Sequence, residues 1–426
     1  MNTVVYGAGG AAKLLLEKYR DSLGTVLFAA TNAGTFLDQP VIPADELVNV
    51  QFDRLIIASS YVTEILNHLL ALGVSIDNAE WFFAEEQRII SAEELGIQKQ
   101  DSSDILYAFY DLALNPSTYD SAVFAARAEM ARQRLEKKWI HFVIVPSLIA
   151  GGRPGDKQRY GGVEQIKWRQ DSVVASVFKL LENCIACSQL ATRGEVFGLL
   201  DQAKYTFPEK YHPASPSDDH RLADAIVDWE SGGNPYCFKA PEIAKQHVQQ
   251  WLDTCQHNRK LLTLTLREYD YLTERNASLH DWQDFFLTLD SEQYCVVIIR
   301  DTDKMFQVLP EALQQYESFP AASLDVRFRM ALYEKAYLNL TVTTGPSSLL
   351  YFTEYPYIQF KTFVSGVRAS EIEFHKERTG AEVGSKFPLT RWNQKWFWFE
   401  DSKNSIIQEF NELTSIIESS TGVERE

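Results

Sequence analysis

The chain has 426 residues, 45% of them hydrophobic, and 41 Lys and Arg against 58 Asp and Glu give a net charge of −17. This length allows about two to four domains with substantial cores, and the acidic balance argues against non-specific binding to nucleic acid. No apolar run reaches the about 20 residues that a bilayer-spanning helix needs, and five Cys with scattered spacing are typical of a reducing compartment. We therefore expect a multidomain cytoplasmic protein with no nucleic acid partner and no transmembrane segment.

Residues 1–98 alternate between strand and helix patterns, which predicts a parallel sheet. The first strand, residues 3–7, runs into a turn with Gly7, Gly9 and Gly10 before a helix begins. Free N–H groups at a helix N-terminus attract a phosphate, so this turn is a candidate nucleotide site. The second strand ends without the acidic residue that would bind the ribose of NAD. A turn that only serves the scaffold is the alternative.

Residues 99–138 differ from the module before them. The segment starts with the polar run KQDSSD and continues with FAARAEMARQRLEKKW, which is rich in good helix formers. We expect a helical connector between two domains, with its charged side chains on a solvated face.

Residues 139–258 form the next predicted α/β domain. Its first strand, residues 140–149, ends in a Gly-rich loop that would face a cleft or form a plain turn. Cys184 and Cys187 fall in a pattern that predicts a helix. Three side chains of this domain could act as a catalytic base, and the sequence does not choose among them: Asp156, Glu164 and His212.

Residues 259–426 form the last predicted α/β domain. A strand over residues 260–267 leads into Arg267, and Arg275 and Asn276 follow in the next loop. Ligands of α/β proteins bind at the carboxyl ends of parallel strands, where guanidinium groups can clamp a diphosphate. The alternative is an arginine pair that ties down a surface loop.

The run LTVTTGPSSLLYF predicts a strand, a tight loop and a helix. It places Thr344, Gly345, Ser347 and Ser348 beside the free N–H groups of the helix N-terminus, where a phosphate could bind. Helix capping alone is the alternative. A further pattern, D-x-D after the strand that ends at Arg300, is more typical of turn capping than of a metal site.

Two parts of the chain resemble known families. The runs GAGGAAKLL, LDQPVIPADEL and FDRLIIASSYVTEILNHLLALGV resemble the small Rossmann-like modules of bacterial sugar acetyltransferases and deoxysugar methyltransferases. In the acetyltransferases such a module contributes to sugar-nucleotide binding. The combination of LREY, ERN and TTGPSSL over residues 260–362 resembles the C-terminal domain of GT-B glycosyltransferases, including the fucosyltransferase-like branch, where a Gly/Ser loop meets the donor diphosphate.

These resemblances and the α/β pattern imply three Rossmann-like parallel-sheet units, the last two forming a GT-B-like two-domain cleft. They imply a glycosyltransferase that moves a sugar from a nucleotide-sugar donor to a hydroxyl of a glycan or protein acceptor, with no obligatory metal or other cofactor. Two other functions stay open: an NAD(P)-dependent oxidoreductase or epimerase that uses the N-terminal Gly-rich turn, and a non-catalytic scaffold that binds sugar nucleotides. Association into a homo-oligomer also stays open.

Overall fold

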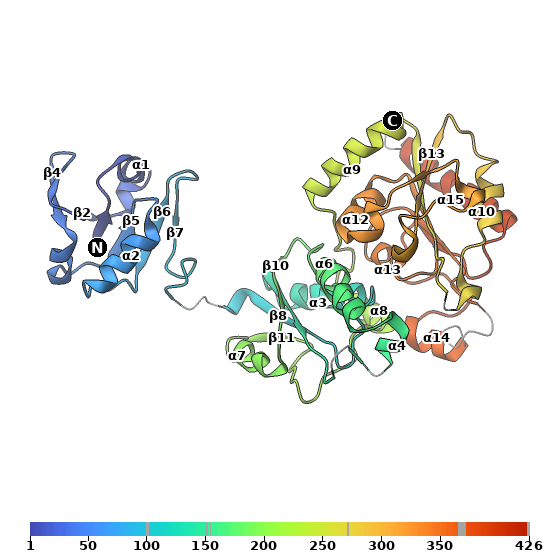
Figure 1. Cartoon of the computed structure of the whole chain (residues 1–426), viewed down its shortest axis with the longest axis horizontal. Helices are drawn as coiled ribbons and strands as arrows, with labels where there is room; N and C mark the ends of the chain where they lie inside the picture. Colours follow the sequence, from blue (N-terminus) through green and yellow to red (C-terminus); the bar gives the residue numbers. More distant parts are fainter. Residues whose placement is uncertain (99–101, 150–151, 154, 271, 365–371, 424–426) are drawn as a thin grey trace. The chain divides into compact units, whose positions relative to one another are not determined.

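The computed structural model describes residues 1–426 except 99–101, 150–151, 154, 271, 365–371 and 424–426. The chain divides into two compact units, Met1–Ser102 and Ser103–Glu426. Both are layered α/β structures in which helices cover sheets (Figure 1). Among the described residues, no helix is long and apolar enough to cross a bilayer.

The smaller unit has a sheet with the strand order β3-β4-β2-β1-β5-β6-β7. Its five inner strands are parallel, and β3 and β7 add antiparallel edges. Apolar side chains of β1 alternate between two cores, one under α1 and one under α2. The elements are β1 (Asn2–Tyr6), α1 (Gly10–Tyr19), β2 (Thr25–Ala30), β3 (Gly34–Phe36), β4 (Gln39–Pro43), β5 (Arg54–Ile57), α2 (Val62–Ala71), β6 (Ala79–Phe83) and β7 (Arg88–Ile90).

The larger unit begins with a parallel sheet of the order β10-β9-β8-β11. Its strands are β8 (Ile105–Asp111), β9 (Trp139–Val145), β10 (Cys184–Gln189) and β11 (Tyr205–Phe207). Its helices are α3 (Ser121–Arg134), α4 (Asp156–Tyr160), α5 (Val163–Arg169), α6 (Ala175–Phe178), α7 (Val196–Leu200) and α8 (Leu222–Glu230). A π-helical turn, Gln170–Val174, joins α5 to α6.

The second sheet of this unit is also parallel and has the order β14-β13-β12-β15-β16-β17. Its strands are β12 (Lys260–Thr265), β13 (Tyr294–Ile299), β14 (Glu317–Ser318), β15 (Leu338–Val342), β16 (Tyr357–Phe360) and β17 (Gln394–Trp396). The helices of this half are α9 (Glu242–Cys255), α10 (Leu279–Phe286), α11 (Ala321–Leu324), α12 (Val326–Lys335), α13 (Ser347–Leu350), α14 (Ile372–Thr379) and α15 (Lys403–Val423). One face packs against α10 and α15, and the other shares a continuous apolar core with the first sheet of the unit.

The prediction of an α/β chain built on three sheets dominated by parallel strands is confirmed. The sheets of the predicted domains 139–258 and 259–426 belong to one compact unit. Helix α9 links them and packs against α12 of the second sheet.

The prediction of a solvated helical connector over residues 99–138 is wrong. Residues Ile105–Asp111 form β8, and all seven are buried between β9 and β11. Their unbroken apolar run is typical of a strand that is covered on both faces. Helix α3 does form, but its alanines are buried and its charges are paired, as in Arg132–Glu129 and Arg127–Asp228. Small alanine side chains allow this charged sequence to pack closely under a sheet.

The predicted helix at Cys184 and Cys187 is also wrong. Helix α6 ends at Phe178, and the two cysteines lie in β10, which pairs with β9. Burial raises the pKa of Cys184 to about 11 and that of Cys187 to about 12, so both remain neutral thiols near neutral pH.

Replacing Ala126 with Leu tests the burial of α3. Ala126 is fully buried, so the larger side chain should lower the free energy of unfolding by about 1–3 kcal/mol. The control is Ala191→Leu, at an exposed position of the same unit. This variant should change the free energy of unfolding by less than about 0.5 kcal/mol. Chemical denaturation of both variants measures the difference, and equal stabilities would mean that α3 is solvated.

Candidate functional site

The strand order of the last sheet determines where a ligand can bind. Numbered along the chain, its six strands run 3-2-1-4-5-6, which is the order of the dinucleotide-binding Rossmann fold. The chain leaves β12 toward β13 on one side and reaches β15 on the other, so the loops after β12 and β15 diverge. Ligands of such sheets bind in the crevice at this switch point. Both predicted donor segments, around Arg267 and around Gly345, begin there.

Arg267 and Asn276 organise the loop after β12. The buried Arg267 donates from Nη1 to the Leu272 carbonyl at 2.9 Å and also to Asn276 Oδ1. Asn276 Nδ2 in turn donates to the Tyr269 carbonyl at 2.9 Å. Burial lowers the pKa of Arg267. The two residues therefore give the loop a defined shape at the sheet edge.

Arg275 joins the two sides of the switch point. Its Nη2 donates to the carbonyl of Thr343, directly after β15, at 3.4 Å. Burial, and after it the nearby charge of Arg267, lower its pKa to about 10. Arg275 forms no ion pair with a carboxylate among the residues that the structure describes. A cation removed from water without a counter-ion is costly, and an anionic ligand would relieve that cost.

The TTGPSS loop differs in part from the prediction. Helix α13 has only four residues, and its two serines are buried. Ser347 Oγ donates to the Thr344 carbonyl at 2.6 Å, and the Thr344 N–H donates back to it at 3.0 Å. The hydroxyl groups thus brace the loop, whereas Gly345 is exposed at its tip.

The same loop touches the first sheet of the unit. Ser348 Oγ donates to the Gly345 carbonyl at 2.8 Å and to the Tyr119 carbonyl at 2.9 Å, and Tyr119 follows β8. A Cβ on Gly345 would lie 3.2 Å from Cδ2 of the Tyr119 ring. A second contact runs from Tyr269 OH to the carbonyl of Arg159, after β9, at 3.1 Å. The carboxyl edges of the two sheets therefore face each other.

The facing edge of the first sheet has its own switch point, between β8 and β11. Asn115 Oδ1, in the loop after β8, accepts from the Asp219 N–H at 3.2 Å and lies 3.0 Å from His220 Nδ1. A hydrogen bond from His220 lowers the pKa of the neighbouring Asp218 to about 2. These bonds hold the two loops together and fix the chain that leads to Tyr119.

Asp120 lies at the tip of this fixed segment, as the N-cap residue of α3. Its side chain is exposed, and Oδ2 accepts a hydrogen bond from Thr118 Oγ1 at 2.7 Å. Its charge acts on Arg275 across the two sheet edges. Sequence reasoning missed Asp120 because it assigned this segment to a connector. Its place in the loop between the apolar run of residues 105–110 and the helix that follows could have identified it.

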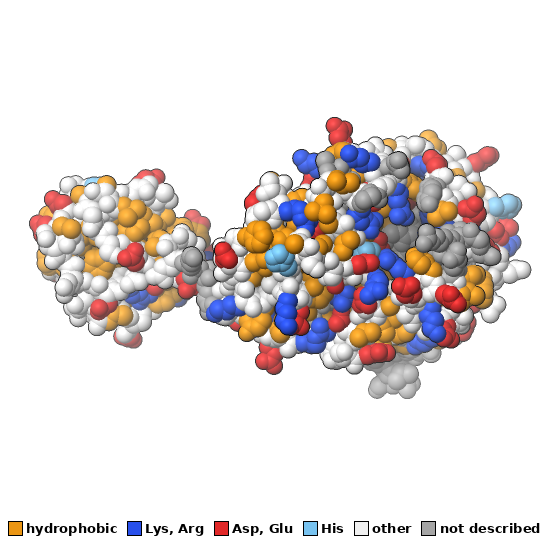
Figure 2. Space-filling view, turned by 90° about the horizontal axis from the view of Figure 1, so that it is seen from below, with side chains coloured by type: hydrophobic (Ala, Val, Ile, Leu, Met, Phe, Trp, Pro, Cys, Tyr) orange, Lys and Arg blue, Asp and Glu red, His pale blue; other side chains and the backbone are white. Residues whose placement is uncertain are grey.

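Arg329 of α12 is a second residue that the sequence did not single out. It is 2% exposed, donates from Nη1 to Tyr333 OH at 3.2 Å, and its Nε has no hydrogen-bond partner. The charge of Asp301 acts on it from the end of β13. Its charge also acts on Tyr119 of the facing loop. A buried cation thus lies under the point where the two edges meet. Figure 2 shows further Lys and Arg side chains on this unit.

The three predicted base candidates occupy different environments. Asp156 is buried and accepts from the N–H of Arg153 at 3.0 Å, which closes the Gly-rich loop. Glu164 is exposed on α5, and His212 is exposed with Nδ1 accepting from the Ala214 N–H at 3.1 Å. Among the described contacts, none joins these three side chains to Arg275 or to the Gly345 loop.

In the D-x-D pattern, the side chain of Asp301 bonds a neighbouring loop and makes no capping bond in its own turn. Asp301 Oδ2 accepts from the N–H of Glu268 at 2.6 Å, and burial raises the pKa of Asp301. Arg300 binds the Glu268 carboxylate through two hydrogen bonds of 2.7 and 2.8 Å. Within the described ranges, no group of three His, Cys, Asp or Glu side chains is arranged to hold a metal ion.

The N-terminal Gly-rich turn lies at the switch point of its own sheet, between β1 and β5. Gly7 has φ +125°, and a Cβ there would lie 2.6 Å from the Ala58 carbonyl oxygen, so the packing of the two strand ends requires glycine. Gly9 and Gly10 have open space around them. The turn serves the scaffold at Gly7, and ligand binding at Gly9 and Gly10 stays a prediction.

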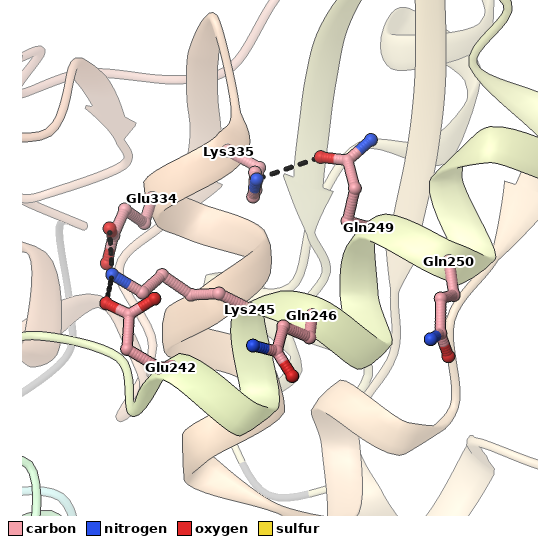
Figure 3. Close-up of a pocket in the computed structure, with 7 residues that line it drawn as sticks. All are labelled: Glu242, Lys245, Gln246, Gln249, Gln250, Glu334 and Lys335. Carbon is pink, nitrogen blue, oxygen red and sulfur yellow. Dashed lines mark hydrogen bonds and ion pairs between the residues drawn. The ribbon is translucent and has the colours of Figure 1, made fainter.

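A separate hollow lies between α9 and α12 (Figure 3). Lys245 points between Glu242 and Glu334 and pairs with both, at 3.1 Å to Glu334, and Lys335 donates to Gln249 at 2.8 Å. The charges of Lys245, Glu242 and Glu334 are therefore paired within the hollow. We interpret the hollow as the polar seam between α9 and α12.

Comparisons with known proteins show only distant similarity. No protein-family model matches the chain, and no curated protein sequence matches it. The chain is similar to a solved family 9 glycosyl transferase from Veillonella parvula, with 10% identity, coverage of 61% of this chain and 80% of that one, and a TM-score of 0.38. It is also similar to E. coli ADP-heptose LPS heptosyltransferase II, with 10% identity, coverage of 99% of this chain and 100% of that one, and a TM-score of 0.32. A third similar structure is UDP-GlcNAc 2-epimerase from Neisseria meningitidis, with 12% identity, coverage of 98% of this chain and 92% of that one, and a TM-score of 0.30. With TM-scores below 0.5, none of these similarities transfers a function to this chain.

Replacing Ser348 with Ala tests the contact between the sheet edges. Loss of the hydroxyl leaves the Tyr119 carbonyl without this donor, so the free energy of unfolding should fall by about 1 kcal/mol. The control is Ser231→Ala, because Ser231 Oγ donates only to the Val227 carbonyl at an exposed helix end. Thermal or chemical unfolding of the two variants gives the comparison, and an equal loss in both would show that the bond between the edges contributes nothing.

Proposed function

We propose that the chain is a glycosyltransferase that moves a sugar from a nucleotide-sugar donor to a hydroxyl of a glycan or protein acceptor. One observation carries the proposal. The 3-2-1-4-5-6 strand order brings the Arg267–Arg275 loop and the TTGPSS loop to a single switch point, which faces a second sheet edge with the exposed carboxylate of Asp120. A two-substrate transfer needs such a pair of facing edges, one for each substrate.

The donor diphosphate would bind at the last sheet. Arg275 would supply the charge, while the backbone of Thr344 and Gly345 would let the phosphates approach closely. Arg267, Asn276, Ser347 and Ser348 would keep these groups in place. As the bond from C1 of the sugar to the diphosphate breaks, negative charge grows on the leaving nucleoside diphosphate. Fixed cations in a site with little water stabilise that charge without an obligatory metal.

The acceptor would bind at the facing edge, and Asp120 is the base that this geometry favours. Its carboxylate would take the proton of the acceptor hydroxyl while the hydroxyl oxygen forms the new bond to C1. The hydrogen bond from Thr118 fixes the direction of the carboxylate. Asp120 takes precedence over Asp156, whose carboxylate is occupied within its own loop.

Replacing Arg275 with Ala tests the donor site. Loss of a charged hydrogen bond to the diphosphate should cost about 1.5–3 kcal/mol, which is about a 10- to 150-fold rise in the Kd of the nucleoside diphosphate. Calorimetric titrations with ADP, GDP, UDP and CDP would first identify the nucleotide, with NAD(P)H as the competing class of ligand.

The control for Arg275→Ala is Arg327→Ala, an exposed arginine of α12 that pairs with Asp325. This variant should keep its affinity. Unchanged affinity in Arg275→Ala would remove Arg275 from the donor site, and tight binding of NAD(P)H alone would favour the oxidoreductase.

Replacing Asp120 with Asn tests the base. The change keeps the size of the side chain, so nucleotide affinity should stay within about twofold, while kcat should fall by about 100-fold or more. Release of the nucleoside diphosphate, measured with a crude glycan fraction as acceptor, follows turnover. Glu164→Gln and His212→Ala serve as comparisons and should retain most of the activity. A full loss of activity in either, with Asp120→Asn active, would reassign the base.

A further inference from the structure

Several large apolar side chains are highly exposed on the loops at the two facing sheet edges of the larger unit. Among its described residues, the three most exposed large apolar side chains are Leu148 at 75%, Phe306 at 76% and Val308 at 79%. Leu148 follows β9 and is adjacent to Ile149, which is 52% exposed. Phe306 and Val308 follow β13. Exposed apolar groups that recur on neighbouring loops mark an interaction surface.

The backbone holds these side chains outward. Ser147, directly before Leu148, donates from Oγ to the Gly152 carbonyl at 2.8 Å. Buried Arg300 donates from Nη1 to the carbonyls of Gln307 and Val308 at 3.0 and 2.9 Å. These bonds fix the backbone next to Leu148 and at Val308.

Contacts between the loops make the two apolar sites parts of one rim. Lys304, in the loop of Phe306, lies 3.7 Å from the carboxylate of Asp270 in the loop after β12. The adjacent Tyr269 donates to the Arg159 carbonyl, in helix α4, which comes after the loop of Leu148. The rim therefore runs from the loop after β9, over the loop after β12, to the loop after β13.

The part of the rim after β9 is basic, although the chain is acidic, whereas the loops after β12 and β13 also expose Asp270 and Asp303. Residues 153–169 contain five Lys and Arg against two Asp and Glu, within a chain of net charge −17. Lys157, Arg159 and Lys167 are exposed, and none of them forms an ion pair among the described residues. Exposed Val163 lies four residues before Lys167, so α5 presents an apolar and a cationic group on the same side.

We propose that this rim binds the surface of a membrane that contains anionic lipid. Leu148, Ile149, Phe306 and Val308 would enter the interface between headgroups and acyl chains, and Lys157 and Lys167 would lie against the lipid phosphates. An acidic chain is repelled by such a membrane, so the apolar side chains and the cations after β9 would have to face it. The proposal is independent of the sugar donor, and it would place the facing edges of the two sheets at the bilayer.

Vesicle cosedimentation of the full chain tests the proposal. Binding to phosphatidylcholine vesicles with about one third phosphatidylglycerol should exceed binding to pure phosphatidylcholine by about tenfold, and salt should weaken it. Leu148→Glu combined with Phe306→Glu should reduce binding to the anionic vesicles by about tenfold. The matched control is Val227→Glu with Leu287→Glu, which changes two apolar side chains of similar exposure on α8 and at the end of α10. This control should bind as the unchanged chain does.

A second pair of variants tests the charge. The double variant Lys157→Glu with Lys167→Glu should weaken binding to anionic vesicles by about tenfold. The control, Lys13→Glu with Lys179→Glu, makes the same change of net charge at other exposed positions and should leave binding unchanged. Absence of binding to anionic vesicles, or equal losses in the rim variants and their controls, would overturn the proposal. Rim variants that bind vesicles normally but lose a soluble protein partner would assign the rim to that partner instead. Nucleotide affinity, measured on the same samples, reports separately on the proposed function.

Discussion

The handedness of the connections between parallel strands determines where this protein can act. Right-handed crossovers wind the chain outward from the first strand of a sheet in one direction and then in the other. In each of the three sheets the first strand is flanked by the second on one side and by a later strand on the other. The loops at that point diverge and leave space that side chains of the sheet do not fill. The candidate residues of the chain all follow from this constraint: Gly9 and Gly10 in the first sheet, Asp120 in the second, and Arg275 and Gly345 in the third.

Electrostatics then distinguish the edges. At the third sheet, Arg329 is buried and Arg275 is partly buried, and neither has a paired carboxylate among the described residues. The pKa of Arg275 falls to about 10, mainly because of desolvation. At the second sheet, Asp120 carries a negative charge at an exposed loop tip. An uncompensated cation suits a diphosphate, and a carboxylate opposite suits a hydroxyl that must lose a proton. The packing of Tyr119 against Gly345 holds the two edges in register.

The sequence predicted much of the fold because its signals were local. Apolar runs such as LIIA and VVII, separated by helical periods, identify buried parallel strands, and β5 and β13 lie where these runs predict them. Arg267, Arg275 and the TTGPSS loop were found because they follow such strands directly. The failure at α3 has a tertiary cause. The charged residues of α3 suggest solvent exposure, but partners far along the chain, such as Asp228 for Arg127, neutralise them.

The roles of the serines and of Asp120 depend on tertiary contacts that spacing cannot reveal. Sequence reasoning placed the hydroxyls of Ser347 and Ser348 toward a phosphate, yet both are used within the loop and against Tyr119. Asp120 was overlooked because β8 itself was missed, and with it the sheet edge that gives the carboxylate its position. Arg329 lies 62 residues beyond Arg267 along the chain, and only the folding of α12 over β12 brings its charge under the same edge.

The central claim is that a nucleoside diphosphate binds at the switch point between β12 and β15. A crystal structure of the full chain with the nucleoside diphosphate that binds most tightly tests it most directly. The account predicts phosphate density beside the backbone of Thr344 and Gly345, within hydrogen-bond distance of the Arg275 guanidinium. Density at Gly9 and Gly10 of the N-terminal turn, with the β12–β15 edge empty, would contradict it.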